Sequence, residues 1–131
     1  MLGVDTNVLV RLLVEDDVER TRRAQRLIVR AVERGEAVVV SLIVLLEAEW
    51  VLRSRYGFAK EAVLRSLNSL LEARELDFED EAAVEEALFS YREGPTGFAD
   101  CLSAAHNRRL GCVATATFDA RAARTPGFVL A

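Results

Sequence analysis

The chain opens with Met1-Leu2-Gly3-Val4-Asp5-Thr6-Asn7-Val8-Leu9-Val10. A short apolar run ends in an acid, two small polar residues follow, and apolar residues then resume. This pattern predicts a strand over residues 2–5 whose C-terminal end presents the Asp5 carboxylate at a turn into a helix. Ligands of open α/β sheets bind at such strand ends, so Asp5 is the first candidate site residue.

Strand-like and helix-like segments alternate along the rest of the chain. This alternation predicts an α/β fold with a parallel sheet, and 131 residues with 51% hydrophobic content predict a single globular domain over 1–131. Further strands are predicted at 37–40, 75–78 (at the sheet edge), 112–115 and 127–130. Helices are predicted at 7–14, 19–34, 42–56, 59–71, 80–92 and 97–110, and a short capped segment at 119–123.

Several helix ends are marked by particular residues. Ser41 and Thr96 are the predicted N-caps of the helices that follow them, because a hydroxyl can accept from a free backbone N–H. Gly35, Gly57 and Gly111 are the predicted helix ends, since glycine adopts the left-handed conformation that terminates a helix.

Composition limits where the protein works and which metal it can bind. The longest apolar run, 42–46, is far short of the roughly 20 residues of a membrane span. The N-terminus lacks a secretory pattern, so we expect a cytoplasmic protein.

Cys101 and Cys112 are predicted to be buried and reduced, and with His106 as the only histidine a Cys/His zinc site is nearly excluded. A metal would be held by carboxylates, which favours Mg²⁺ or Mn²⁺.

The charge is unevenly distributed. The net charge is −4, but residues 72–86 hold eight of the 21 acidic residues, and the rest of the chain is net positive. Lys60 is the only lysine, and arginines at 23, 26, 30 and 34 form a stripe on one predicted helix. Arginine matches phosphate geometry, yet such a stripe is also typical of a solvated helix face, and both interpretations stay open. The acidic segment would repel RNA, and we interpret it as a helix that faces solvent.

Glu47 and Glu49 lie on a predicted helix that is apolar nearly all round. They are about 200° apart around the helix axis, so one can be exposed while the other points inward. A buried carboxylate needs a partner. For Glu47, an arginine salt bridge, for example to Arg53, and a metal-ligand role stay equally open.

Two further acids stand at the starts of helical segments. Asp100 lies in the first turn of its helix, where the helix dipole alone explains an acid. Asp119 follows the fourth predicted strand, where helix capping is the alternative explanation. Thr117 is placed to support this site with a hydroxyl hydrogen bond.

The four carboxylates together make a stronger case than each alone. If the first and fourth strands are neighbours, Asp5, Glu47, Asp100 and Asp119 can meet. Two carboxylates about 4 Å apart repel by roughly 4 kcal/mol at an effective dielectric of about 20. A divalent cation would remove this penalty, so the pattern predicts a metal site.

Four motifs in this order resemble the PIN-domain family, most closely the VapC-type toxins of prokaryotic toxin–antitoxin pairs. The motifs are Val4-Asp5-Thr6-Asn7-Val8-Leu9, Leu45-Leu46-Glu47-Ala48-Glu49-Trp50-Val51-Leu52, Phe98-Ala99-Asp100-Cys101-Leu102 and Thr117-Phe118-Asp119. Each motif alone is weak, but together they span nearly the whole chain.

The resemblance implies a three-layer α/β/α fold with a central parallel sheet of four to five strands in the order 3-2-1-4-5. It implies a ribonuclease dependent on Mg²⁺ or Mn²⁺, commonly a homodimer, that is inhibited by a cognate antitoxin. The residues that match the family's acidic quartet are Asp5, Glu47, Asp100 and Asp119, with Thr6, Asn7 and Thr117 in supporting positions. Glu49 stands where many relatives carry an apolar residue, and the Trp50-Val51-Leu52 that follows fixes the alignment on Glu47.

The predicted substrate is RNA, and Arg11, Arg23 and Arg26 are candidate phosphate contacts. One alternative is a phosphoryl-transfer or phosphatase-like α/β domain. Such sites need a paired aspartate motif at the first strand or a lysine late in the chain, whereas this sequence has Asp5-x-Asn7 and no lysine after Lys60. A non-enzymatic α/β binding module is the other alternative. No Ser-His-Asp or Cys-His set is evident for a covalent route.

Overall fold

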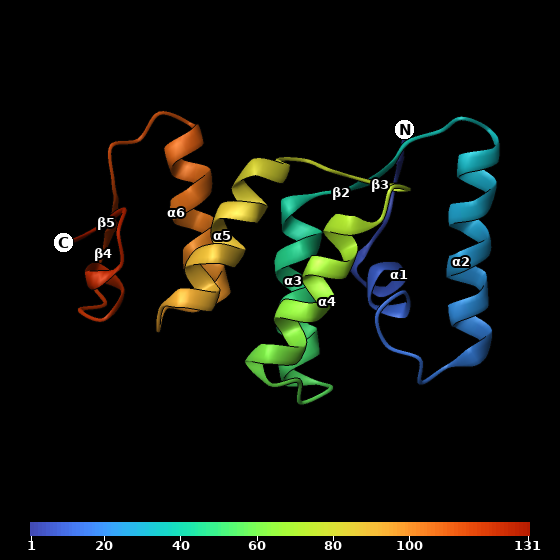
Figure 1. Cartoon of the computed structure of the whole chain (residues 1–131), viewed down its shortest axis with the longest axis horizontal. Helices are drawn as coiled ribbons and strands as arrows, with labels where there is room; N and C mark the ends of the chain where they lie inside the picture. Colours follow the sequence, from blue (N-terminus) through green and yellow to red (C-terminus); the bar gives the residue numbers. More distant parts are fainter. The chain divides into compact units, whose positions relative to one another are not determined.

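The computed structural model describes all residues from Met1 to Ala131. The chain folds into two compact units, residues 1–79 and residues 80–131, and each is described by itself (Figure 1). The expectation of a single domain over 1–131 stays a prediction.

The first unit is built on a three-stranded parallel sheet in the order β1-β2-β3. Leu2 lies opposite Val38, and Val38 lies opposite Leu76. The predicted order 3-2-1 and the edge position of the third strand are therefore confirmed. The strands are β1 (Leu2–Gly3), β2 (Val38–Val40) and β3 (Leu76–Phe78).

Helices lie on both sides of these strands. In Figure 1, α2 lies on one side and the pair α3 and α4 on the other. The core between them is apolar, with Val38, Leu45 and Leu67 almost completely buried. The helices are α1 (Thr6–Arg11), α2 (Val18–Glu33), α3 (Leu42–Ser54) and α4 (Lys60–Glu72).

The helix ends of this unit follow local chemistry. The Ser41 side chain accepts from the backbone N–H of Val44 at 3.3 Å, so the predicted N-cap of α3 is confirmed. Asp17 caps α2 in the same way. Gly35 and Gly57 have φ values of 68° and 65°, which confirms them as helix ends.

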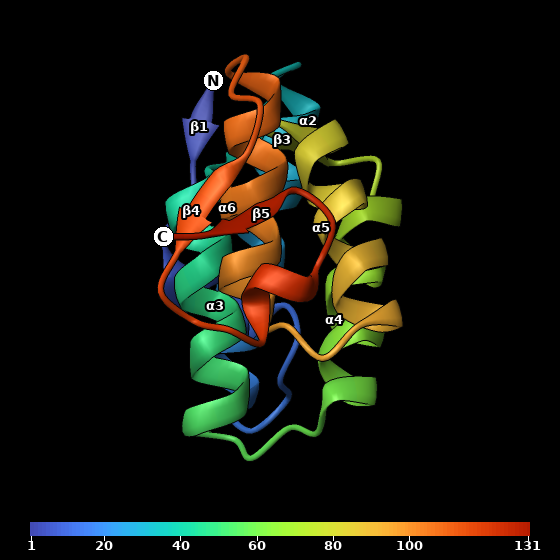
Figure 2. The ribbon, with the colours of Figure 1, turned by 90° about the vertical axis from the view of Figure 1, so that its left-hand side faces the viewer.

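The second unit pairs two helices with a short parallel sheet. Helices α5 (Glu81–Glu93) and α6 (Phe98–Arg109) pack together, with the rings of Tyr91 and Phe98 5.9 Å apart. Strand β4 (Thr115–Thr117) contacts α6, and β5 (Phe128–Leu130) pairs with β4 (Figure 2). A 3₁₀ turn, η1 (Ala122–Arg124), connects them, in place of the helical segment predicted at 119–123.

Strand β4 begins three residues later than predicted. Cys112 has the apolar character of a strand residue, but its backbone N–H donates to the carbonyl of Asn107 and closes α6 instead. Gly111, with φ 98°, allows this ending. Cys112 is consequently exposed, which corrects the prediction that both thiols are buried; Cys101 is buried as predicted.

The N-cap predicted for α6 is also wrong. Gly97 occupies that position, and no side chain caps the helix. The buried Thr96 hydroxyl shares a hydrogen bond with the Thr125 hydroxyl instead, which ties the start of α6 to the loop before β5. The break at Gly94 to Gly97 is itself confirmed.

The α/β class and the parallel pairing of strands are confirmed in both units. Strand β1 belongs to the first unit and β4 to the second. That these two strands are neighbours stays a prediction. No helix is long and apolar enough to cross a membrane.

Candidate metal centre

Asp5 lies two residues beyond the end of β1 and caps α1. Its backbone is extended, with φ −89° and ψ 176°, and its Oδ1 accepts from the backbone N–H of Val8 at 3.0 Å. Capping and metal binding are compatible here, because the side chain is exposed and forms no ion pair. The sequence prediction of a carboxylate at a strand-to-helix turn is confirmed.

Thr6 connects this turn to α3. The Thr6 side chain is buried, and its Oγ1 donates to Oε2 of Glu47 at 2.9 Å. Glu47 itself is exposed and forms no ion pair. Because Thr6 directly follows Asp5, this hydrogen bond places the Glu47 carboxylate near the end of β1.

Glu49 has a different environment from Glu47. Its side chain is only 1% exposed, and both of its oxygens accept from the guanidinium of Arg53 one turn later, Oε1 at 3.2 Å and Oε2 in a shorter ion pair. The arginine salt bridge considered for Glu47 is therefore formed by Glu49. Only Glu47 remains available to a ligand.

The other two acids of the predicted quartet belong to the second unit. Asp100 is exposed in the first turn of α6 and forms no ion pair. Asp119 lies two residues beyond the end of β4, as Asp5 lies two residues beyond β1, and its Oδ1 accepts from the backbone N–H of Arg121 at 2.9 Å. The Thr117 hydroxyl accepts from the backbone N–H of Asp119 at 3.0 Å, so Thr117 holds the turn that presents this acid.

The donor set fits a hard divalent cation. All four side chains are exposed carboxylates that are unpaired with any base, in a chain with 17 basic residues. Within each unit, no three His, Cys, Asp or Glu side chains lie close enough together to hold a metal ion. The first unit supplies Asp5 and Glu47, the second supplies Asp100 and Asp119, and the meeting of the two pairs stays a prediction.

Asn7, the second supporting residue, is exposed and lines a groove between α1 and α2 with a volume of about 420 Å³. Arg11 and Arg23 line the same groove. Arg23 and Arg26 are exposed and form no ion pair, and both line an adjoining hollow with Arg30. The basic stripe of α2 thus begins beside the turn that carries Asp5.

Arg11 has intramolecular partners that the sequence did not indicate. It forms an ion pair with Asp16 and donates to the Tyr56 hydroxyl at 2.6 Å. Burial lowers the pKa of the Arg11 guanidinium, but Tyr56 and Asp16 outweigh this effect and raise the pKa above its usual value. Part of the hydrogen-bonding capacity of Arg11 is therefore used within the chain, by Asp16 and Tyr56.

The acidic segment 72–86 is partly neutralised by the C-terminal end of α6. Asp80 caps α5 and pairs with Arg109 at 2.6 Å, and Glu86 pairs with Arg108. His106 lies on the same face, with Nδ1 3.7 Å from the Asp80 carboxylate. These ion pairs could not be predicted from the sequence, because they form only when α5 packs on α6.

Comparison with known proteins agrees with the motif pattern. The family described as PIN domain matches residues 3–127. No curated protein matches the chain. A crystal structure of VapC20 from Mycobacterium tuberculosis, described as a Sarcin-Ricin loop cleaving toxin, aligns with 20% sequence identity over 97% of this chain and 96% of that chain, with a TM-score of 0.42. Because the family match covers nearly the whole length, this chain belongs to the PIN-domain family.

Proposed function

We propose that the protein is a metal-dependent endoribonuclease that acts as the toxin of a toxin–antitoxin pair. The family match supports a nuclease. The observation that carries the site assignment is the hydrogen bond from Thr6 to Glu47, because it aligns an α3 carboxylate with the end of β1 where Asp5 lies. The order of the four acidic motifs supports the toxin branch of the family.

In this proposal Asp5, Glu47, Asp100 and Asp119 hold Mg²⁺ or Mn²⁺. When bound, such an ion supplies Lewis acidity and neutralises charge on the scissile phosphate. Thr6 orients Glu47 through its hydroxyl, and Thr117 holds the backbone turn at Asp119. In this role the two threonines are positioning residues, because each acts through an acid of the quartet.

The chain's own arginines would bind the RNA strand. Arg23 and Arg26 are exposed without ion pairs, and the groove that Arg23 shares with Asn7 leads toward the Asp5 turn. Arg11 would contribute charge to the same groove. Contacts of this kind go to phosphate oxygens, so they would bind RNA with little dependence on base sequence.

The proposal includes a cognate antitoxin as inhibitor, a homodimer and a cytoplasmic location. The antitoxin and the homodimer follow from the resemblance of the four motifs, and the cytoplasmic location follows from the lack of a secretory pattern at the N-terminus and of a long apolar run.

Incubation of the purified chain with structured RNA tests the reaction. With Mn²⁺ we expect internal cleavage of the RNA, and with a chelator no cleavage. Asp5→Asn should abolish cleavage, while Asp77→Asn, which changes an exposed strand acid outside the quartet, should leave it unchanged. Release of phosphate from small phosphomonoesters without RNA cleavage would support a phosphatase-like domain instead, and no reaction at all would leave a binding module.

A further inference from the structure

Phe118 lies directly between Thr117, the last residue of β4, and Asp119. Its side chain is 90% exposed, which makes it the most exposed aromatic residue of the chain. The ring forms no contact with another aromatic ring. A large apolar side chain that is left in water beside a proposed metal ligand indicates a contact with a molecule that binds there.

The backbone on both sides of Phe118 is held by hydrogen bonds. The Thr117 hydroxyl accepts from the backbone N–H of Asp119 at 3.0 Å, and the Thr117 carbonyl accepts from the N–H of Ala131 at 2.7 Å. Oδ1 of Asp119 in turn accepts from the backbone N–H of Arg121 at 2.9 Å. Phe118 therefore stands on an ordered turn, and a ligand that binds to its ring need not order this backbone first.

The segment that follows Asp119 is basic. Residues 120–131 contain two arginines, Arg121 and Arg124, and no acidic side chain. Both arginines are exposed and form no ion pair, so their guanidinium groups are available to phosphate oxygens. Proteins bind single-stranded nucleic acid with this combination, in which an aromatic ring stacks on a base and basic side chains contact the backbone.

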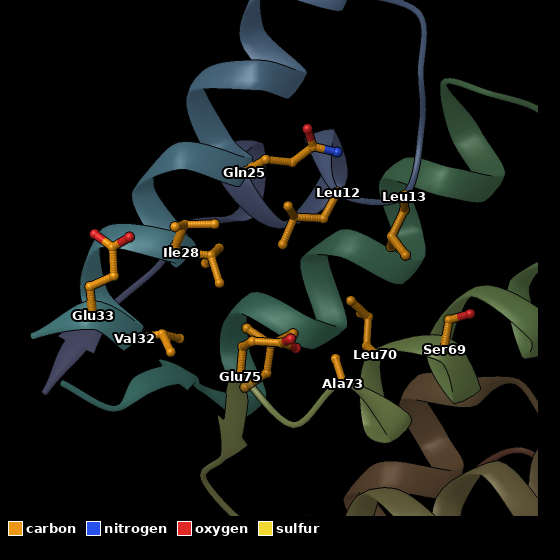
Figure 3. Close-up of a pocket in the computed structure, with 12 residues that line it drawn as sticks. Leu12, Leu13, Gln25, Ile28, Val32, Glu33, Ser69, Leu70, Ala73 and Glu75 are labelled. Carbon is orange, nitrogen blue, oxygen red and sulfur yellow. The ribbon is translucent and has the colours of Figure 1, made fainter. Parts of the chain in front are cut away.

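An apolar surface alone does not favour RNA, as a groove in the first unit illustrates. It has a volume of about 440 Å³, and Figure 3 shows Val32 and other apolar side chains that line it. Its charged residues are two acids, Glu33 and Glu75, which are exposed without an ion pair. These carboxylates would repel phosphate, whereas the basic segment after Phe118 attracts it. The charge around each apolar surface therefore favours RNA at Phe118 and not at this groove.

We propose that the Phe118 ring stacks on an unpaired base next to the scissile phosphate and that Arg121 binds a neighbouring phosphate. A base within a duplex is stacked on both faces, so only an unpaired base can offer a face to the ring. Every base has such a face, so Phe118 distinguishes unpaired from paired bases without selecting one base type. The inference rests on the proposed function, because the scissile phosphate lies beside Phe118 only if Asp119 holds the metal ion.

Two labelled RNA probes of equal length test the proposal on the full chain. One is a single-stranded RNA, and the other has the same phosphates but abasic sites in place of the bases. Their affinities are measured by fluorescence anisotropy in chelator, which prevents cleavage. Phe118→Leu keeps an apolar side chain without a ring and should weaken binding of the RNA about tenfold, but not binding of the abasic probe. Phe118→Trp should retain the wild-type affinity for the RNA.

A charge variant and two matched controls complete the comparison. Arg121→Gln should weaken binding of both probes by the same factor, because a phosphate contact does not depend on the base. Phe89→Leu removes the exposed ring of α5, and Arg65→Gln changes an exposed arginine of α4. Both controls should bind the two probes as the wild type does. Because the Phe118 ring is exposed, Phe118→Leu should also melt at the wild-type temperature.

Four outcomes would overturn the proposal. Phe118→Leu could bind the RNA as the wild type does, or it could weaken both probes equally, and either result would exclude stacking on a base. A lower melting temperature in Phe118→Leu would show that the ring packs within the fold. A wild-type dimer that dissociates in Phe118→Leu but not in Phe89→Leu would assign the ring to a contact between copies of the chain.

None of these readouts uses RNA cleavage. A wild type that does not cleave RNA, but binds the RNA through Phe118 and the abasic probe without it, would count against the proposed function and leave stacking by Phe118 standing. A wild type that cleaves RNA, with Phe118→Leu unchanged in binding, would count against the stacking alone.

Discussion

The Thr6 hydroxyl donates a 2.9 Å hydrogen bond to Oε2 of Glu47, 41 residues away in the chain. Thr6 is buried while Glu47 is exposed, so the carboxylate is held from its protein side and presents its remaining acceptor capacity outward. The residue directly before Thr6, Asp5, belongs to the same proposed ligand set. This contact between α1 and α3 explains why a threonine is suited to the position after the first acid.

Replacement of Thr6 by valine tests that contact. Thr6→Val keeps the shape but removes the hydroxyl, and we expect a loss of about 0.5–1.5 kcal/mol in the free energy of unfolding. Supporting partners of metal ligands are typically worth about 10–100-fold in metal affinity or activity, so the Mn²⁺ concentration needed for half-maximal cleavage should rise about tenfold or more. Thr6→Ser, which restores a donor, should recover most of this loss. A Thr6→Val protein with the wild-type Mn²⁺ dependence would show that the hydrogen bond is only structural.

Glu47 and Glu49 are predicted to separate function from stability. Glu47→Gln should remove metal-dependent cleavage with little change in unfolding free energy, because Glu47 is exposed without an ion pair. Glu49→Gln weakens a pair between a buried carboxylate and the half-exposed Arg53, and we expect a loss of about 1–2 kcal/mol with cleavage retained. Urea unfolding and cleavage rates of the two variants measured together check this. The opposite pattern would mean that Glu49 is the ligand.

The arginines of α2 should control RNA affinity. Arg23→Gln/Arg26→Gln, measured in chelator to prevent cleavage, should weaken RNA binding. The slope of log affinity against log salt should decrease by roughly 0.7 for each phosphate of single-stranded RNA that the variant no longer neutralises. Arg65→Gln, an exposed arginine of α4, is the control and should bind as the wild type does. An unchanged slope in the double variant would show that these arginines do not contact RNA phosphates and only face solvent.

The Asp80–Arg109 pair should stabilise the second unit. Asp80→Ala removes both the N-cap of α5 and the ion pair, and we expect a loss of about 1–2 kcal/mol in unfolding free energy. In a double-mutant cycle with Arg109→Gln, the coupling should be about 0.2–1 kcal/mol because Arg109 is half exposed. Additive losses in the cycle would show that capping accounts for the whole effect of Asp80.

Local sequence signals predict the parts of the fold that depend on neighbouring residues. Ser41 is recognisable as a cap and Gly35 as a helix end because each acts on backbone groups within a few residues. The turn at Asp5 follows from the change between apolar and polar residues over ten positions. These features need no knowledge of the rest of the chain.

The predictions that are wrong concern residues whose structure depends on contacts with residues far away in the chain. The hydroxyl of Thr96 is bound to Thr125, 29 residues away, and is therefore not available as a cap. Cys112 and the residue after it have strand-forming side chains, but β4 is placed where Thr115 pairs with Phe128. The sequence also leaves open which of Glu47 and Glu49 points outward. In the structure, Glu47 is hydrogen-bonded to Thr6, and Glu49 is paired with Arg53 and buried.

We propose that acids from both units hold one divalent metal ion, and thermal unfolding in the presence of Mn²⁺ measures the binding of that ion. At a Mn²⁺ concentration about 100 times Kd, binding stabilises by about 2.7 kcal/mol, which corresponds to a rise in Tm of roughly 10 °C for a chain of this size. We expect this rise in the wild type and in Asp77→Asn, and its loss in both Asp5→Asn and Asp100→Asn. A wild-type Tm that does not respond to Mn²⁺, or a full rise in either Asp5→Asn or Asp100→Asn, would contradict it.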